Sequence, residues 1–282
     1  MTPKDLEIID RPSPKTDSPY INNHIHTCHS FSPYTPTDAV YLACKNGLAT
    51  AGIVDHDTTS GAKEFLEAGA KLGMPVTVGA ECRIDMSRTK LKGRRINNPD
   101  QLSVAYVATH AIPHCSLDLM DGFLAPYRAA RNVRNREMVE NINRFTEAFG
   151  LEISFEKDVL PLSVTSVTER HLLFALTKKI TGKYSEPADV IAFMTDVMGI
   201  NVSEKNRTNI LNGKQTPRFY EYDILGALKS GLVEKIYVPA TAELPDVGEY
   251  TDFVRKIGGI SAYAYLGEVE YEVQVMRIVE QR

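Results

Sequence analysis

The feature that most constrains the fold is an alternation of short apolar segments with helical segments over roughly the first 115 residues. Short apolar runs joined to helices by short loops are typical of βαβ units around a parallel sheet. The sequence therefore predicts the α/β class. The expected strands lie at 20–26, within 48–57, at 74–82 and at 102–111, and the expected helices lie at 37–45 and 60–72.

The pattern of hydrophobic residues changes after Leu124. Residues 126–149 have the spacing of a long amphipathic helix, and residues 151–230 are mostly helical in pattern. Segments 232–240 and 258–267 are again typical of strands. We expect a polar leader at 1–19 with a short strand near residues 6–9, one α/β domain at 20–124 and 231–282, and a largely helical insertion at 125–230.

Charge and composition exclude several classes of protein. The formal net charge is −4, so no global positive field favours long nucleic acids. No segment has the length and apolarity of a membrane span, and the N-terminus lacks a signal-peptide pattern. The four cysteines form no CxxC pair, which indicates reduced thiols in a cytoplasmic protein and argues against a structural zinc site.

Histidines and carboxylates stand at the ends of the expected strands. They are His24 and His26, the triplet at 55–57 (DHD), Glu81 and His110. The carboxyl ends of strands in parallel α/β folds are where sites are assembled. Imidazole and carboxylate groups together suit first-row divalent metals, so these positions predict a metal site.

The spacing of His24 and His26 supports this prediction. Side chains two residues apart on a strand point to the same face, so both imidazoles can approach one ion. Asp55 and Asp57 flank His56. One of them either orients His56 through its other ring nitrogen or caps the following helix, and the sequence leaves both readings open.

The order of residues 24–27 (HIHT), 52–59 (GIVDHDTT) and 78–81 (VGAE) resembles the PHP family, named for polymerase and histidinol phosphatase. The resemblance is clear over about residues 20–115 and looser beyond them. It implies a distorted (β/α)7 TIM-like barrel, two or three divalent ions (manganese, iron or zinc) and phosphoester hydrolysis. His24, His26 and His56 match the first two motifs, and Glu81 matches the third, whose carboxylate often bridges two metals; these four are the expected catalytic residues.

Further site residues follow from the same resemblance. Residues 167–171 (VTERH) are similar to a stretch where small family hydrolases place another ligand histidine, so His171 is expected to bind metal, and His110 is a further expected ligand. Arginine can bind phosphate through two parallel hydrogen bonds. The expected substrate-binding arginines are Arg128, Arg131, Arg134 and Arg170.

Three departures from the family pattern leave alternatives open. Residues 30–31 read Ser-Phe where the family usually has an aspartate, His110 is a few residues later than the usual strand-four histidine, and no histidine follows His171. Residues 262–267 read AYAYLG where many relatives read LAHP. Either the sequence is shortened, or the third metal position is altered.

We therefore expect a cytoplasmic, metal-dependent phosphoesterase that acts on a small phosphorylated metabolite or nucleotide through metal-activated water. Nucleic acid fits only as a nucleotide or short oligonucleotide, and the oligomeric state is left open. The alternative is a degenerate barrel that binds a phosphorylated ligand or a partner without turnover. A metal-dependent amide hydrolase is the weakest candidate, because no lysine that could be carbamylated stands at a strand end.

Overall fold

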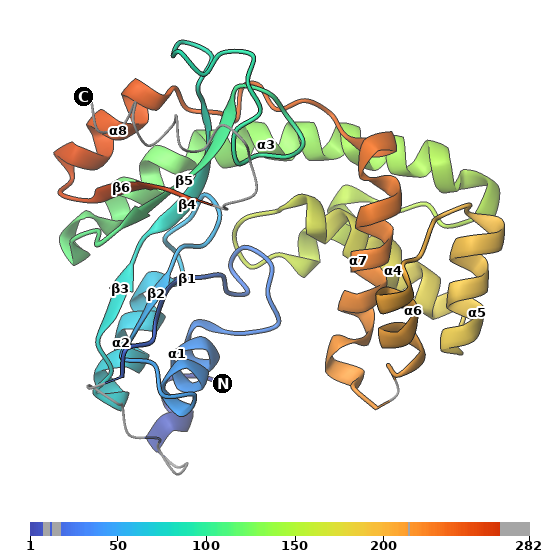
Figure 1. Cartoon of the computed structure of the whole chain (residues 1–282), viewed down its shortest axis with the longest axis horizontal. Helices are drawn as coiled ribbons and strands as arrows, with labels where there is room; N and C mark the ends of the chain where they lie inside the picture. Colours follow the sequence, from blue (N-terminus) through green and yellow to red (C-terminus); the bar gives the residue numbers. More distant parts are fainter. Residues whose placement is uncertain (8–11, 13–17, 214, 266–282) are drawn as a thin grey trace. The chain divides into compact units, whose positions relative to one another are not determined.

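The computed structural model describes residues 1–265 except 8–11, 13–17 and 214 (Figure 1). The chain divides into two compact units. The first, the α/β unit, contains Met1–Arg131, Val164–Ser166 and the chain from Ala240 onward. The second, the helical unit, contains Asn132–Ser163 and Val167–Pro239. The expected boundaries after residues 124 and 230 thus lie several residues before those of the two units.

A parallel sheet opens the α/β unit. Strands β1 (Ile21–Ile25), β2 (Thr50–Ile53) and β3 (Val76–Val78) lie side by side in that order. Helix α1 (Pro36–Lys45) connects the first pair and α2 (Ala62–Leu72) connects the second. A capping box between Thr35 and Asp38 starts α1. The βαβ pattern expected from the sequence is confirmed over this part of the chain.

A second sheet follows, and it is antiparallel. Its strands are β4 (Ala80–Asp85), β5 (Val104–His110) and β6 (Ile260–Tyr263). The expectation of a parallel sheet that includes residues 102–111 is wrong. A parallel return needs a crossover of a dozen or more residues, usually a helix, whereas the 86–103 connection contains no helix and lets β5 pair antiparallel with β4.

Gly79 is the single residue between β3 and β4. A Cβ atom at this position would lie 1.7 Å from the carbonyl oxygen of Thr109, so no larger residue fits beside this backbone. Glycine therefore lets the chain pass directly from the parallel sheet into the antiparallel one. An isolated bridge between His56 and Glu81 connects the loop after β2 to β4 at this point.

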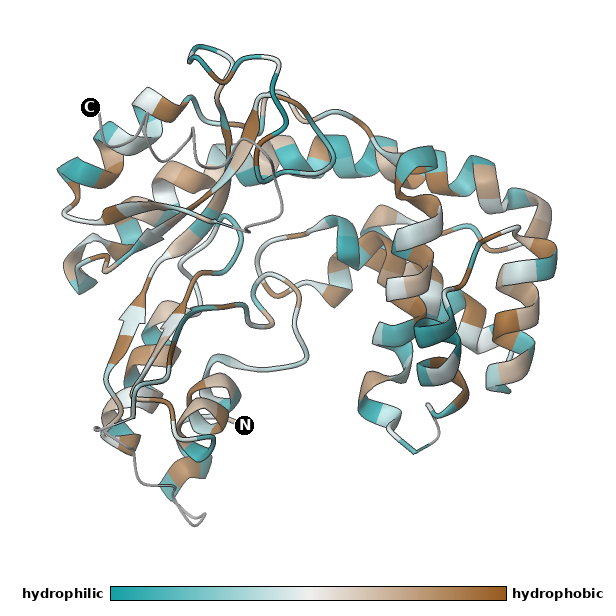
Figure 2. Ribbon diagram, in the orientation of Figure 1, coloured by the Kyte–Doolittle hydropathy of each residue, from teal (hydrophilic) through white to brown (hydrophobic). Residues whose placement is uncertain are grey.

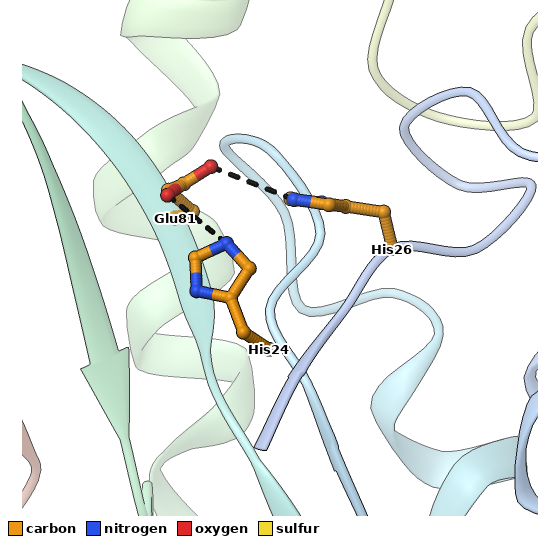
Figure 3. A group of neighbouring side chains, drawn as sticks. All are labelled: His24, His26 and Glu81. Atoms are coloured by element: carbon orange, nitrogen blue, oxygen red, sulfur yellow. Dashed lines mark ion pairs between the residues drawn. The ribbon is translucent and has the colours of Figure 1, made fainter. Parts of the chain in front are cut away.

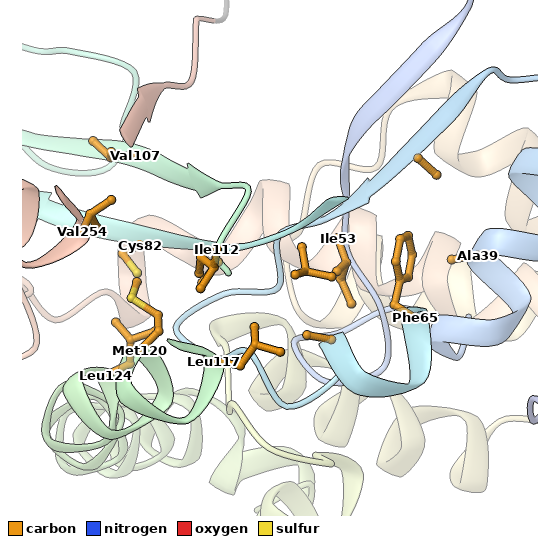
Figure 4. Close-up of a cluster of buried hydrophobic side chains, with 14 of the residues drawn as sticks. Ala39, Ile53, Phe65, Cys82, Val107, Ile112, Leu117, Met120, Leu124 and Val254 are labelled. Atoms are coloured by element: carbon orange, nitrogen blue, oxygen red, sulfur yellow. The ribbon is translucent and has the colours of Figure 1, made fainter. Parts of the chain in front are cut away.

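The antiparallel sheet has one apolar face and one polar face. Cys82 and Val107 are buried on the apolar face and pack with Met120, Leu124 and Val254 (Figure 4). Residues on the other face are offset by one position along each strand. The polar face therefore carries Glu81, Arg83, Tyr106 and His110.

The remaining helices surround these sheets or build the helical unit. Helix α3 (Leu117–Thr146) belongs partly to each unit, and hydrophilic and hydrophobic residues alternate along it (Figure 2). Val133 on this helix is 59% exposed. The other helices and single turns are η1 (Asp5–Glu7), η2 (His114–Ser116), η3 (Glu147–Phe149), η4 (Phe155–Val159), η5 (Leu160–Leu162), α4 (Glu169–Lys183), α5 (Pro187–Ala192), η6 (Phe193–Val197), α6 (Glu204–Leu211), α7 (Pro217–Ile236) and α8 (Val247–Lys256).

Two other expected strands are corrected. Residues 232–236 form the last turn of α7 instead of a strand, because Leu228, Leu232 and Ile236 are buried at helical spacing. Near the N-terminus, Asp5–Glu7 form a 3₁₀ turn around buried Leu6 in place of a strand; residues 8 and 9 of that prediction lie outside the described residues. The strand expected at 258–267 is observed at Ile260–Tyr263, and its last two residues are likewise outside the described part.

The α/β class is confirmed, whereas a closed barrel is not. The described residues form two separate three-stranded sheets, and no strand ladder between them completes a ring. Across the same described residues, no helix combines the length and the apolar character that a bilayer span requires.

Candidate metal centre

Three imidazoles converge on the carboxylate of Glu81. His24 Nε2 lies 3.2 Å from Glu81 Oε1, and His26 Nε2 lies 3.6 Å from Oε2 (Figure 3). His56 Nδ1 lies 3.2 Å from the same Oε2. Glu81 is only 4% exposed, so this carboxylate is a buried hub for the three rings. The four residues are called the Glu81 cluster below.

The strands of the α/β unit position each member of the Glu81 cluster. His24 lies on β1 and His26 directly follows it, so their side chains share a face. His56 follows β2, and Glu81 is the second residue of β4. The rings of His26 and His56 stack with centroids 4.4 Å apart, and those of His24 and His26 meet edge to face at 5.2 Å.

The donor set of the cluster fits a divalent metal. One ligand atom from each of His24, His26 and Glu81 lies within 4.8 Å of the other two. The Glu81 carboxylate, through its hydrogen bond, raises the pKa of His24, which means that a positive charge at this position is favoured. Nitrogen and carboxylate ligands of this kind suit manganese, iron and zinc.

Asp55 holds the loop that follows β1. Its carboxylate is 1% exposed and accepts three hydrogen bonds of 2.6 Å each, from the Thr27 amide, the Thr27 hydroxyl and the Ser30 hydroxyl. The sequence predicted that Asp55 or Asp57 orients His56 or caps the next helix. The three bonds of Asp55 do neither, since they go to Thr27 and Ser30. It fixes the loop after His26 to the loop that carries His56.

Asp57 holds the His56 loop from the other side. Its backbone amide donates to the Glu81 carbonyl at 2.9 Å, and its φ of 54° is the left-handed conformation that aspartate tolerates better than most residues. Its carboxylate forms a buried ion pair with Arg131. The loop is therefore tied both to β4 and to α3.

Three of the four expected substrate-binding arginines have partners within the protein, and the fourth is exposed. Arg128 forms a fork with Asp121 at 3.0 and 2.8 Å and also donates to the Asp57 carbonyl at 2.7 Å. Arg131 pairs with Asp57. In the helical unit, Arg134 donates through Nε to the Val238 carbonyl at 2.5 Å, and Arg170 is exposed. Arg128 and Arg131 thus support the site's loop, and contact of any of the four with a substrate stays a prediction.

His110 lies at the end of β5 on the polar face of the antiparallel sheet, outside the group of three close ligand atoms. Burial lowers the pKa of His110, and the nearby charge of His24 lowers it further. This pKa favours a neutral imidazole, which is the form that binds metal. His110 therefore stays a predicted ligand.

His171 lies in the helical unit and caps α4 there. Its Nδ1 accepts a hydrogen bond of 2.9 Å from the Thr168 amide, and the ring is 1% exposed. Burial lowers the pKa of His171 to about 4. The structure thus gives this ring a role in helix capping, and its assignment as a metal ligand stays a prediction.

His29 has partners in a segment far along the chain. Its Nδ1 lies 2.9 Å from the Thr165 hydroxyl, and its carbonyl accepts from the Ser166 amide at 3.0 Å. Both partners belong to the α/β unit, although they interrupt the sequence of the helical unit. No sequence signal pointed to this contact, because neither partner is near His29 in the chain.

The α/β unit brings three histidines around a buried carboxylate, which is a donor set suited to a metal ion. The PHP domain model matches residues 22–199, which is more than half of the chain. The chain therefore belongs to the PHP family, as its motifs predict.

Two curated relatives are error-prone DNA polymerases. The chain is 35% identical over 66 residues to the one from Corynebacterium diphtheriae (23% of this chain, 6% of the polymerase). It is 28% identical over 110 residues to the one from Nocardia farcinica (38% of this chain, 10% of the polymerase). The chain thus spans about a tenth or less of the length of these relatives.

Two solved structures share the fold. One is a protein from Bifidobacterium adolescentis assigned as a metal-dependent phosphoesterase, with a TM-score of 0.58, 21% identity, and coverage of 93% of this chain and 75% of that one. The other is an amidohydrolase from Chromobacterium violaceum with bound sulfate and no metal, with a TM-score of 0.60, 16% identity, and coverage of 93% and 72%. At these identities the likeness establishes the fold and nothing further.

Proposed function

We propose that this protein is a metal-dependent hydrolase of phosphoesters whose substrate is a small phosphorylated metabolite or nucleotide. The observation that carries the proposal is the convergence of His24, His26 and His56 on Glu81. The family supports it, and so does the solved structure assigned as a metal-dependent phosphoesterase. The net charge of −4 favours a small substrate over a long nucleic acid.

The Glu81 cluster would hold two or three divalent ions, with His110 as the next available ligand. When bound, divalent ions of this kind bind phosphate oxygens and supply hydroxide at neutral pH. Glu81 brings a negative charge to a site that is otherwise built from imidazoles. Asp55 and Asp57 hold the two histidine-bearing loops in place through the contacts described above.

The protein's own residues must also fix the orientation of the ligands. A metal-binding imidazole is positioned best when the loop that carries it has no freedom to shift. The Asp55 bonds to Thr27 and Ser30 restrict the loop after β1, and the Asp57–Arg131 pair restricts the loop after β2. We propose a cytoplasmic location for this reaction, since all four cysteines are free thiols.

One observation favours a second candidate, a barrel that binds a phosphorylated ligand without turnover. Ser30 stands where the family usually has an aspartate, and its hydroxyl is buried and donates to Asp55. A residue used in this way adds no charge to the metal site. A site with one carboxylate fewer would bind fewer ions, and a phosphate ligand could then be held without being hydrolysed.

Elemental analysis combined with turnover separates the two candidates. The protein is purified without chelator, its manganese, iron and zinc content is measured, and a panel of phosphorylated metabolites and nucleotides is assayed for phosphate release. We expect two or more ions per chain and turnover of at least one compound. One ion or none, together with no phosphate release, would instead support the binding protein.

The substitution His56→Ala tests the site itself. We expect it to lower the metal content by about one ion while the protein stays folded, because one of the three imidazole nitrogens next to Glu81 is lost. His114→Ala is the matched control, since His114 is exposed on η2. Equal metal contents in the two variants would contradict the assignment of the cluster.

A further inference from the structure

Tyr106 stands on the same sheet face as the Glu81 cluster. In the antiparallel pairing of β4 with β5, Glu81 lies opposite Ala108 and Arg83 lies opposite Tyr106. All four side chains therefore project from one face, and the residue opposite Glu81 is the small, buried Ala108. No sequence motif singled out this tyrosine.

The phenol ring reaches the neighbourhood of the metal cluster. Its centroid lies 6.1 Å from that of the His56 ring, at an interplanar angle of 48°. Arg83 lies directly opposite Tyr106 on this face, and the charges of Arg83, Arg131, Glu81 and Asp100 act on its phenol group. The ring is partly buried, and its backbone is pinned by two hydrogen bonds with the Asn97 side chain, at 2.8 and 2.9 Å.

The two arginines near Tyr106 are already paired. Arg83 lies 2.7 Å from Glu243, and Arg131 pairs with Asp57; all four residues of these pairs are buried. Each guanidinium is thus paired with a carboxylate, and the phenol adds an uncharged O–H group to the same face of the sheet. Burial raises the pKa of Tyr106, and a phenol is protonated at neutral pH in any case.

We infer that Tyr106 donates a hydrogen bond from its phenol to a non-bridging oxygen of a phosphoryl group bound at the Glu81 cluster. This inference rests on the proposed function, since it deepens the account of the same site. A neutral donor beside the metal site binds an oxygen that gains negative charge during transfer, and its hydrogen bond strengthens as that charge develops. Tyr106 is thereby a substrate-binding residue.

The test is the substitution Tyr106→Phe, which keeps the ring against His56 and removes the hydroxyl alone. We expect the affinity of the manganese-loaded protein for inorganic phosphate, measured by calorimetry, to fall about 10-fold. We expect kcat/KM for a hydrolysed phosphoester to fall by about 10- to 100-fold. Metal content and melting temperature are expected to match the wild type, which separates a binding role from a structural one.

The matched control is Tyr263→Phe. Tyr263 lies on β6, in register with Val107, and so belongs to the opposite face of the same sheet. We expect this variant to bind phosphate as the wild type does. Equal phosphate affinity in wild type and Tyr106→Phe would overturn the inference, and so would a wild type that binds no phosphate.

The two measurements keep this inference apart from the proposed function. If Tyr106→Phe has the same turnover and the same phosphate affinity as the wild type, the role of Tyr106 is overturned and the phosphoesterase proposal still stands. A wild type without turnover that still binds phosphate more tightly than Tyr106→Phe overturns the phosphoesterase proposal and supports the phenol contact.

Discussion

Buried His171 makes the stability of the helical unit sensitive to mild acid. The ring is 1% exposed, and its Nδ1 accepts the Thr168 amide at the start of α4. Protonation would place a charge in an apolar site and convert this acceptor into a donor. Burial accordingly lowers the pKa of His171 from 6.5 to about 4 in the folded protein.

The sign and the size of the effect follow from this shift. The pKa in the folded state is below that in the unfolded state, so the unfolded chain binds the proton first as the pH falls. The contribution of neutral His171 is complete above pH 6.5 and is lost progressively as the pH falls toward 4. At pH 5 the loss is about 2 kcal/mol, since each pH unit below 6.5 costs about 1.36 kcal/mol.

The assay compares two proteins at two pH values. In His171→Asn, the amide oxygen stands where Nδ1 stood and can accept the same Thr168 bond, but it does not titrate. The free energy of unfolding is measured by urea titration of the chelated proteins at pH 7.5 and pH 5.0. We expect the wild type to lose about 2 kcal/mol more than His171→Asn between these values.

The comparison cancels the other titrating groups, because the six remaining histidines are present in both proteins. An equal loss of stability in wild type and His171→Asn would refute the reasoning. A pKa of His171 near 6.5 in the folded protein, followed through its ring signals by NMR, would refute it as well.

Three further outcomes are expected. Asp55→Asn removes the charged acceptor of three buried hydrogen bonds, so we expect urea titration to give a free energy of unfolding lower by about 2–4 kcal/mol; a change under about 0.5 kcal/mol would contradict its role. Gly79→Ala would place a Cβ atom against the Thr109 carbonyl, and we expect the free energy of unfolding to fall by about 3 kcal/mol or more. The control Gly122→Ala has open space around its Cβ position and should leave the free energy of unfolding unchanged or raise it in the same titration. Manganese added to chelated protein should raise the melting temperature of the wild type by binding the folded state, and leave that of Glu81→Gln unchanged; an equal rise in both would show that the ion binds elsewhere.

The sequence predicted those parts of the fold that local patterns determine. Strands β1 and β2 and helices α1 and α2 follow from short-range periodicity, and they lie where expected. The convergence of His24, His56 and Glu81 could be expected for a related reason, since parallel strands bring their carboxyl ends to one edge.

The parts that were not predicted depend on distant partners. Segment 232–240 is compatible with a strand or a buried helix over so short a length, and burial of Leu228, Leu232 and Ile236 on one helical face decided for α7. Arg131 pairs with Asp57, which is far away in sequence, and Arg128 pairs with Asp121 two turns earlier on the same helix. Contact of these arginines with a substrate stays a prediction.

The direct passage from β3 to β4 through Gly79 has a consequence for synthesis. All four members of the Glu81 cluster are translated before the helical unit, which begins at Asn132. These four side chains are therefore synthesised before any residue of the helical unit, so the cluster can form while that unit is still being made. Strand β6 follows the helical unit in the chain, so the outer edge of β5 stays without this neighbour while the helical unit is being made.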